Sequence, residues 1–595
     1  MVESFYHPTI GFLLLALILP FLPGKNWWKW LLPLPAAAAI ISVFTLDPGN
    51  YGTIDWFGFT LQVGRIDKLS LIFANVFAIQ ALIGFIYAFH LKEKSQHVAA
   101  CLYVSGSFGV VFAGDYLTLF IFWELMSVGS VFLIWLNAKN NGRALGAGIR
   151  YFLFHTVGGL LILAGLLLRH KAVGNWDFIP VAQSAAHYYD WLIMFGFGVN
   201  AAFIVLHAWL PDAYPEATVT GAVFMSAFTT KTAVYTLARG FAGWDFLAYM
   251  GVGMALYGVF YATMENNARR ILSYHIMSQV GYMVAGIGIG TAMTLNGACA
   301  HAYAHILYKG LLFMSVGALL YSCGTAKLNE LGGLVGRLPW VMLAYVVAGM
   351  SISGWPLFNG FVSKTMTIAG AFEDHRALLG IGMELAAVGT FLSVGIKLPY
   401  FAFWSKPDAV QREIKPIPWN MYLAMGISSF LCILQGVYPE ILYQFLPYEV
   451  EFHPFSAWQV LQAVLLLSFT GLAFYVMRRI MVPHEQRNVD FEWFYILFGR
   501  AFLFICRYPF AWLDSWWTER YRTWGLRGML AVAAGSSWYD WTGIKGAVDG
   551  VAATTRRVGQ GAAKLQTGRL QTYLAYAVLL AAGVMFAIWA VNQYL

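Results

Sequence analysis

The chain has little charge and little cysteine for its length. Charged side chains make up 11% of the 595 residues and hydrophobic ones 59%, a composition not expected of a soluble domain of this size. The cysteines stand far apart without a CxxC pair, which argues against an iron–sulfur or zinc site. We interpret all of them as small packing residues: Cys101, Cys299, Cys323, Cys432 and Cys506.

Three further signals are missing. Residues 1–24 contain an apolar span without a basic start or a small-residue cleavage site, so we expect no cleavable signal peptide. The glycines of GIGIG at 286–290 lie in an apolar stretch, which is not the setting of a dinucleotide site. The net charge of +8 is spread over short loops, which favours membrane topology over nucleic-acid binding. We therefore expect no catalytic residue, cofactor site or metal site in this chain.

Long apolar runs recur along nearly the whole sequence. Runs of about 18 residues or more predict membrane-spanning helices, so the fold class expected is an all-α polytopic membrane protein. We predict about sixteen spans, with edges uncertain by several residues. They lie at about 8–23, 28–45, 68–90, 97–113, 115–136, 148–168, 190–210, 218–239, 245–263, 271–289, 295–321, 340–370, 378–404, 419–438, 456–478 and 571–592.

Basic residues gather in the loops that follow odd-numbered spans, except the loop after the seventh. Lys92, Lys94, Arg269 and Arg270 are examples. Because cytoplasmic loops carry the excess of Lys and Arg, these loops are predicted to be cytoplasmic, and both termini then lie outside. The location expected is the cytoplasmic membrane of a bacterium or archaeon, with the lipid bilayer around the chain.

The segment 481–566, before the last span, is long and rich in Trp, Tyr and Arg. Such a composition is typical of an amphipathic helix that lies along a membrane surface or a neighbouring subunit. The alternative is a poorly ordered cytoplasmic loop.

Polar residues of two neighbouring regions match at a nearly constant spacing. Asn200 precedes AAFIV as Lys364 precedes TMTIA, and Lys231 matches Lys397. Each region contains five predicted spans. Because five is an odd number, the second copy starts from the opposite side of the membrane to the first, and the two regions are therefore predicted to be inverted repeats. The domains expected are 1–95, with the first three spans, 96–241 and 242–405 as the repeats, 406–480 with two spans, the lateral segment 481–566, and the final span 567–595.

Ionisable residues inside the predicted spans are the candidate proton or ion pathway. A lysine at a helix centre costs about 2.5–3.5 kcal/mol on insertion scales, and such residues usually face a polar interior and move ions or protons. Pro211 and Pro356 each interrupt an apolar run, as expected of broken helices, and Pro211 is expected to end one helix before a second begins near Thr218. Lys231, expected in the middle of that second helix, is the clearest case. The whole set is Glu124, Lys231, His275, His301, His305, Lys309, Lys364 and Lys397.

Four members of this set have alternative interpretations. His301, His305 and Lys309 are four residues apart, so they form one polar stripe that predicts a hydrated path; either histidine alone could be a helix contact, and haem or metal ligation is a further alternative. Glu124 could be capped by hydroxyls such as that of Ser127. Lys397, near a span end, could reach to the interface.

Several stretches together resemble a known family. DYLTLFIFWELMSVGS, WLPDAYPEATVTGAVFMSAFTTKTAVY, ARRILSYHIMSQVGYM, HAYAHILYKGLLFMSVGA and FNGFVSKTMTI are similar to the proton-conducting, antiporter-like membrane subunits of respiratory complex I and of Mrp-type multisubunit Na⁺/H⁺ antiporters, with most resemblance to the D component of the latter. The resemblance covers about residues 65–405. It implies two inverted five-helix repeats, broken seventh and twelfth helices, and a central hydrophilic axis.

By this resemblance, Glu124, Lys231, Lys364 and the set on the eleventh span match the proton pathway of the family. One position departs from it: Asn200 stands where the family usually has a lysine that pairs with the glutamate. Asparagine cannot change its charge, and His207, two turns further on, or Lys231 is the candidate substitute. In addition, LQTGRLQTY near the C-terminus resembles the last span of the largest antiporter-like subunit of complex I.

The sequence therefore predicts an ion-translocating subunit of a multisubunit complex that moves protons, with or without exchange for Na⁺. The partners expected are other membrane subunits. The alternatives are a self-sufficient antiporter, and a proton-pumping or scaffold subunit of a complex I-like or hydrogenase-like redox complex. In the redox case, flavin, nicotinamide and iron–sulfur chemistry belongs to the partners.

Overall fold

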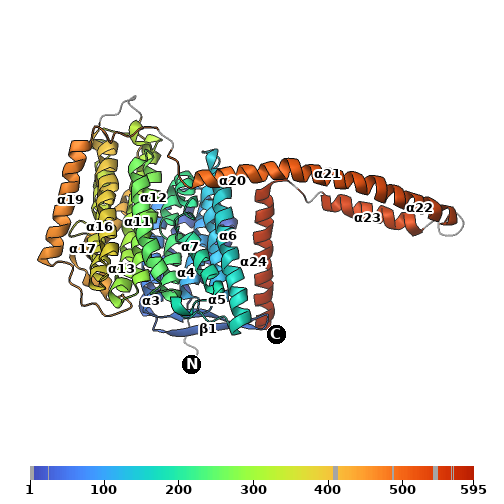
Figure 1. Cartoon of the computed structure of the whole chain (residues 1–595), viewed down its shortest axis with the longest axis horizontal. Helices are drawn as coiled ribbons and strands as arrows, with labels where there is room; N and C mark the ends of the chain where they lie inside the picture. The colour runs from blue at the N-terminus through green and yellow to red at the C-terminus, as the bar shows by residue number, and fades with distance from the viewer. Residues whose placement is uncertain are drawn as a thin grey trace. The chain divides into compact units, whose positions relative to one another are not determined.

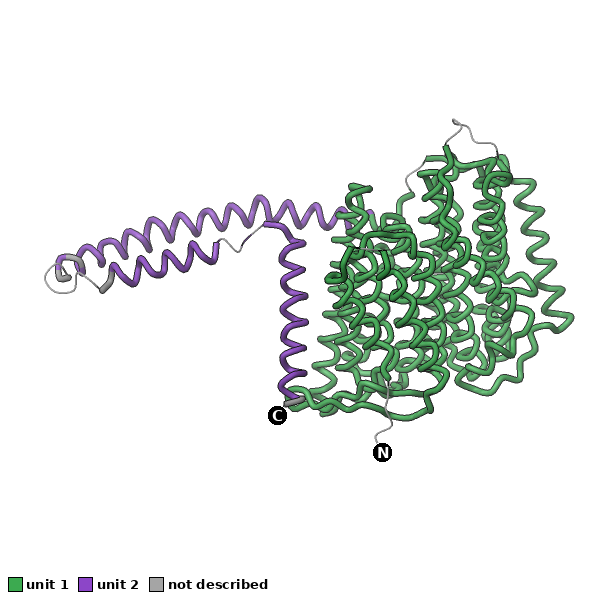
Figure 2. Tube along the Cα trace, turned by 180° about the vertical axis from the view of Figure 1, so that it is seen from behind, with its two compact units in different colours: residues 1–492 green, residues 493–595 purple. Residues whose placement is uncertain are grey.

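A computed structural model describes residues 6–24, 26–405, 413–485, 488–540, 547–563, 566 and 568–594. The chain is mostly helical and divides into two units, residues 1–492 and 493–595 (Figure 2). Parts of the predicted loop 405–418 and of the predicted lateral segment, such as residues 541–546, lie outside the described residues.

The first unit is a bundle of helices that run side by side (Figure 1). Its α-helices are α1 (Pro8–Ile18), α2 (Leu34–Thr45), α3 (Lys68–Ala88), α4 (Lys94–Phe112), α5 (Tyr116–Trp135), α6 (Arg143–Val173), α7 (Tyr188–Asn200), α8 (Trp209–Ala213), α9 (Val219–Met225), α10 (Thr229–Gly240), α11 (Asp245–Met264), α12 (Ala268–Ile289), α13 (Ala292–Cys323), α14 (Pro339–Ser353), α15 (Asn359–Glu373), α16 (Ala377–Thr390), α17 (Trp419–Val437), α18 (Glu440–Tyr443) and α19 (Ala457–Met477). The 3₁₀ segments are η1 (Leu19–Phe21), η2 (Asn26–Leu31), η3 (Gln183–Ala185), η4 (Tyr214–Glu216) and η5 (Leu328–Glu330), and α16 continues into the π-helical η6 (Phe391–Lys397) and η7 (Tyr400–Trp404).

The second unit begins within α20 (Glu492–Ile505), which runs on through η8 (Cys506–Phe510), α21 (Ala511–Arg520), η9 (Tyr521–Leu526) and α22 (Arg527–Asp540). Two further helices follow, α23 (Ala547–Ala563) and α24 (Leu570–Tyr594). Within this unit α20 and α21 bury none of their residues. A continuous helix therefore replaces the alternative of a disordered loop over residues 492–540.

In the described ranges, 11 helices are long and apolar enough to cross a membrane. The chain is thus a multi-pass membrane protein, as the apolar runs predict. The all-α expectation needs one correction, because strands β1 (Gly49–Trp56) and β2 (Phe59–Ile66) form an antiparallel hairpin. Phe57 and Gly58 both have positive φ, as a tight two-residue turn between strands requires.

In the described part of the bundle, three interruptions break the helices, and two lie where proline did not predict them. We expected Pro211 to end a helix, but α7 ends at Asn200, and Ala202 and Val205 take positive φ before Pro211 enters α8. Similarly, the helix expected from Thr218 is split between α9 and α10, which places Lys231 in the first turn of α10 and not mid-helix. The third break, between α14 and α15, contains Pro356 as expected.

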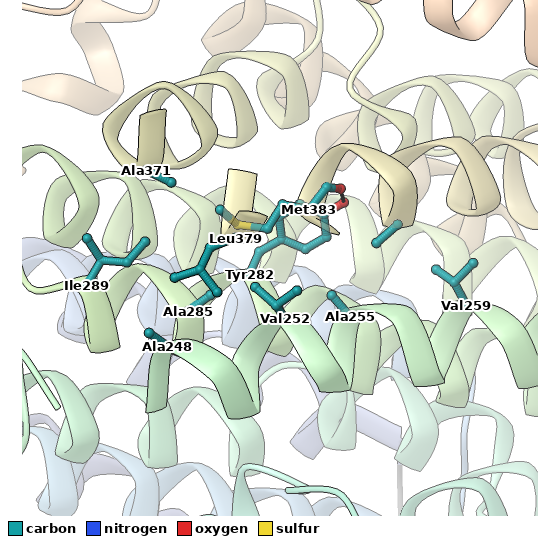
Figure 3. Packing of buried hydrophobic residues seen from close by; sticks show 11 residues of the cluster. Ala248, Val252, Ala255, Val259, Tyr282, Ala285, Ile289, Ala371, Leu379 and Met383 are labelled. Carbon is teal, nitrogen blue, oxygen red and sulfur yellow. Dashed lines mark hydrogen bonds between the residues drawn. The ribbon is translucent and has the colours of Figure 1, made fainter. Parts of the chain in front are cut away.

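Small residues let α11 and α12 pack in close contact. A Cβ on Gly251 would lie 2.2 Å from the Ala285 backbone nitrogen, and one on Gly288 would lie 2.0 Å from that of Ala248. Beside this contact, α11, α12, α15 and α16 share a buried apolar cluster (Figure 3). Lipid tails are as apolar as the side chains of a membrane helix, so no hydrophobic force drives helices together in a membrane. They associate instead through close backbone contact at small residues. This packing holds α15 and α16 against α12.

Candidate functional site

Glu124 lies on α5 and faces α6. Its Oε1 is buried and has no hydrogen-bond partner among the described residues. The carboxylate sits against Gly159 of α6, where a Cβ would be 2.1 Å from Oε1. The hydroxyl of Ser127 does not cap it, because it donates to the Trp123 carbonyl oxygen at 3.0 Å. The capping alternative is therefore wrong for Ser127, and Gly159 provides the space for the carboxylate.

Asn200, the last residue of α7, does not hydrogen-bond to Glu124. Its Oδ1 lies 2.8 Å from Nδ1 of His155 on α6, and both side chains are buried, with His155 1% exposed. Sequence analysis missed His155, because a single histidine in an apolar run gives no signal without its partner 45 residues away.

His207 lies in the interruption between α7 and α8 and contacts a different residue. Its Nε2 is 3.2 Å from both carboxylate oxygens of Asp490, which also accepts hydrogen bonds from the hydroxyls of Tyr257 and Tyr274. Burial opposes ionisation of this carboxyl, but hydrogen bonds from His207 and the two tyrosines outweigh it and hold the pKa of Asp490 well below its usual range. Sequence analysis missed Asp490 too.

The ammonium groups of three lysines lie at the ends of helices. Lys231 donates to the Ser226 carbonyl at 2.6 Å, and Lys364 donates to the Ile352 carbonyl at 2.5 Å. Lys397 donates to the Thr263 and Glu265 carbonyls, at 2.6 and 3.0 Å, where α11 ends, and is buried. The last carbonyls of a helix have no partner within it and carry a partial negative charge. These helix ends thus supply acceptors for the buried ammonium groups.

The predicted stripe on α13 is buried in the bundle. His301 Nδ1 is 3.0 Å from the Ser363 hydroxyl of α15. His305 and the ammonium group of Lys309 have no hydrogen-bond partner in the described part of the chain, and both residues are 0% exposed. Lys309 is close enough to Lys231 and Lys364 for their charges to interact. The stripe therefore lies between the two lysines at helix interruptions.

His275 of α12 contacts η6. Its Nε2 is 2.6 Å from the Ser393 hydroxyl of η6, and its charge would interact with those of Lys309 and Lys364. The structure thus brings His275, the α13 stripe and Lys364 together, while Glu124 lies apart from them on α5.

A cavity of about 460 Å³ opens between α15, α16 and α19 and reaches Lys364. Glu384 of α16, which sequence analysis missed within an apolar run, also lines it and accepts a hydrogen bond from Gln462. A second cavity, of about 560 Å³, shares Glu373 and Gln459 with the first. It is also lined by acidic and histidine side chains: Glu449, Glu451 and His453.

Among the described residues, no group of three or more His, Cys, Asp or Glu side chains is placed to hold a metal ion. The rings of His301 and His305 are 6.3 Å apart, and each histidine faces polar or aromatic neighbours. The arrangement places several ionisable side chains next to one another inside the bundle.

Comparison with known proteins agrees with this architecture. Residues 113–393 match the family described as NADH:quinone oxidoreductase/Mrp antiporter, transmembrane. Hydrogenase-4 component B of Escherichia coli is 28% identical over 417 residues, 62% of this chain and 61% of its own length. The chain thus spans less than two thirds of that relative. The D component of the Na⁺/H⁺ antiporter of Alkalihalophilus pseudofirmus is 26% identical over 426 residues, 68% of this chain and 85% of its own.

A solved structure shares the fold over most of the chain. It is a chain of an archaeal respiratory membrane complex, the membrane-bound sulfane sulfur reductase, with a TM-score of 0.69 at 20% identity, covering 94% of this chain and 99% of the other. The resemblance inferred from sequence motifs is confirmed by these comparisons.

Proposed function

We propose that this antiporter-like membrane subunit, whose residues 113–393 match the NADH:quinone oxidoreductase/Mrp antiporter family, moves protons across the membrane as part of a multisubunit complex, with or without exchange for Na⁺. The observation that carries the proposal is Lys309, fully buried and without a hydrogen-bond partner in the described residues. An ionisable group in that position is costly, and in membrane proteins such groups mark ion and proton paths.

The pathway proposed has two halves that meet at α13. The first half contains Glu124 and Lys231, and the second contains Lys364 and Lys397. His275, His301, His305 and Lys309 connect them. Because like charges disfavour one another in a medium of low dielectric constant, a proton that arrives at Lys231 favours release from Lys309, which in turn favours transfer toward Lys364.

The two halves would be the inverted repeats, residues 96–241 and 242–405, within a fold of about sixteen spans. In support, each proposed repeat contains an interrupted helix, between α7 and α8 in the first and between α14 and α15 in the second. The remaining boundaries, 1–95, 406–480, 481–566 and 567–595, belong to the same proposal, with 481–566 as the lateral amphipathic segment.

The subunit would lie in the cytoplasmic membrane of a bacterium or archaeon with both termini outside, as the basic loops indicate. Its partners would be other membrane subunits, with H⁺, and in an exchanger Na⁺, as the ions moved. This proposal is supported by the multisubunit complex in which the shared fold occurs.

A second candidate function is a proton path in a redox-driven complex. The relative named Hydrogenase-4 component B and the sulfane sulfur reductase chain favour it. In that case electron transfer takes place in other subunits and this chain carries the protons.

The complex, purified with its partners and sealed into liposomes, tests the proposal. Replacing Lys309 by alanine should abolish proton movement while the subunit still assembles. An imposed Na⁺ gradient that drives protons in the wild type identifies an exchanger, whereas proton movement only with an electron donor and acceptor identifies the redox-driven complex. Unchanged proton movement in Lys309→Ala contradicts the pathway.

A further inference from the structure

The contact between α5, α6 and α7 contains a buried titratable group outside the pathway described above. His155 lies one helical turn before Gly159, the residue against which Glu124 packs. Four residues of a helix span about 6 Å, so His155 and the Glu124 carboxylate occupy adjacent turns of one face of α6. Asn200 reaches the same face from α7.

Asn200 sets the proton position on His155. The amide Oδ1 can only accept a hydrogen bond, so the His155 Nδ1 at 2.8 Å must be the donor. In the neutral imidazole the other nitrogen, Nε2, is then an acceptor. Nε2 is buried and has no hydrogen-bond partner in the described residues. It is therefore free to take a proton.

The surroundings suit a group that changes its charge. The rings of Tyr151 and Trp209 lie 4.1 and 4.6 Å from the imidazole, and aromatic faces attract cations. Besides His155, α6 meets Glu124 from α5 and Asn200 from α7. The Asn200 side chain is neutral, so no cation at that position opposes a charged imidazole.

We propose that His155 is the proton-carrying partner of Glu124 in the first half-channel, held in position by Asn200. This rests on the proposed function. Nε2 accepts the proton that the Glu124 carboxyl releases, giving a carboxylate and an imidazolium, and the Nδ1–H···Oδ1 bond to Asn200 is kept. The proton leaves Nε2 in the direction of Lys231, which restores the neutral imidazole.

This pairing explains why asparagine stands at position 200. A lysine there would carry only donors and could not accept from Nδ1. His155 with Asn200 is thus an alternative to a lysine at position 200. A variant in which both His155 and Asn200 are replaced should regain proton movement if one new side chain accepts a hydrogen bond and the other carries a positive charge.

The test uses His155→Gln, the double variant His155→Gln with Asn200→Lys, and His97→Gln as a matched buried-histidine control from α4. Proton movement is measured with the assembled complex in liposomes. His155→Gln should lower the rate about 100-fold, the size typical of losing a positioned proton carrier. The double variant should restore it to within about tenfold of the wild type, because the introduced lysine can donate to the amide oxygen of the introduced glutamine, and His97→Gln should not change it.

Three outcomes overturn the proposal. A near wild-type rate in His155→Gln, with Lys231→Ala inactive, refutes the role of His155 and leaves the proposed function standing. Near wild-type rates in both refute the proposed function and, with it, this inference. Loss without recovery in the double variant assigns His155 a structural role only. If His155→Gln does not assemble, His155→Asn, alone and with Asn200→Lys, takes its place under the same criteria.

Discussion

His207 Nε2 lies 3.2 Å from both carboxylate oxygens of Asp490, across 283 residues of chain. This contact joins the interruption after α7 to the residue that stands two positions before α20. Tyr257 of α11 and Tyr274 of α12 donate to the same carboxylate. The connection around Asp490 is thus fixed to the broken helix of the first half.

Replacing Asp490 by alanine should destabilise this connection strongly. Removing a buried acceptor typically costs about 1–3 kcal/mol for each polar group left unsatisfied, and Asp490 is hydrogen-bonded to His207, Tyr257 and Tyr274. We expect a lower thermal unfolding midpoint of the purified complex and faster proteolysis of the connection between α19 and α20. Glu485→Ala is the control, since its contact with Lys327 is exposed and should contribute less than about 1 kcal/mol.

The same contact should be insensitive to pH over the neutral range. The folded-state pKa of Asp490 is below its usual value, so its stabilisation is fully present above the unfolded value of about 3.9 and is lost only as the pH falls through the lower folded value. Proteolysis of the connection should be equally slow at neutral and at mildly acidic pH. Faster cleavage at mildly acidic pH would contradict the assignment.

Gly159→Ala should block the first half-channel. A Cβ there would lie 2.1 Å from Glu124 Oε1 and must displace the carboxylate. Gly146→Ala, on the same helix, would meet only the flexible end of Arg150 at 3.3 Å. We expect a drop of about tenfold or more in proton movement for Gly159→Ala, since small displacements of reacting groups have large effects, and none for Gly146→Ala. Equal rates would show that Glu124 is not held against α6.

Glu384→Gln should slow proton movement without abolishing it. Glu384 and Lys364 line the same cavity. The negative charge of the carboxylate therefore raises the local proton concentration near the lysine. Glutamine keeps the size and the contact to Gln462 but has no charge. The rate should fall several-fold, and the loss should be greater at low ionic strength if the cavity is open to solution. An unchanged rate would exclude the cavity from the path.

Deleting residues 512–563, with a short linker in their place, should cost assembly or coupling. The described residues of this segment carry many exposed aromatic and aliphatic side chains, which in a membrane complex suit contact with lipid or a neighbouring subunit. The measurement is recovery of the partner subunits with the shortened chain after affinity purification. Full recovery of the partner subunits together with normal proton movement would show that the segment is dispensable.

The sequence predicted the bundle because a span needs about 20 apolar residues, a constraint that composition alone reveals. It also predicted the stripe of His301, His305 and Lys309, since one helix fixes their spacing. The interruption of the seventh span lies after Asn200 and not at Pro211, and the interruption before Lys231 was not predicted. Proline was the expected signal, whereas the positive φ of Ala202 and Val205 is imposed by the tertiary structure and leaves no mark in the residue types.

The missed residues share one cause. Each acquires its role from a partner far away in the chain. The pairs are His155 with Asn200, Glu384 with Gln462, and Asp490 with His207. A single sequence contains no information on such pairs. Asp490 in particular stands in a polar connection where a carboxylate is ordinary, and only the fold buries it.

Proton movement by the assembled complex with Lys231→Ala tests the central claim most directly. Lys231 is fully buried at the interruption between α9 and α10 and holds the Ser226 carbonyl. Lys171→Ala, at the exposed end of α6, is the matched control, and Lys364→Ala examines the second half in the same way. The account predicts normal assembly in all variants, wild-type rates in Lys171→Ala, and no proton movement in Lys231→Ala or Lys364→Ala. A near wild-type rate in correctly assembled Lys231→Ala would contradict it.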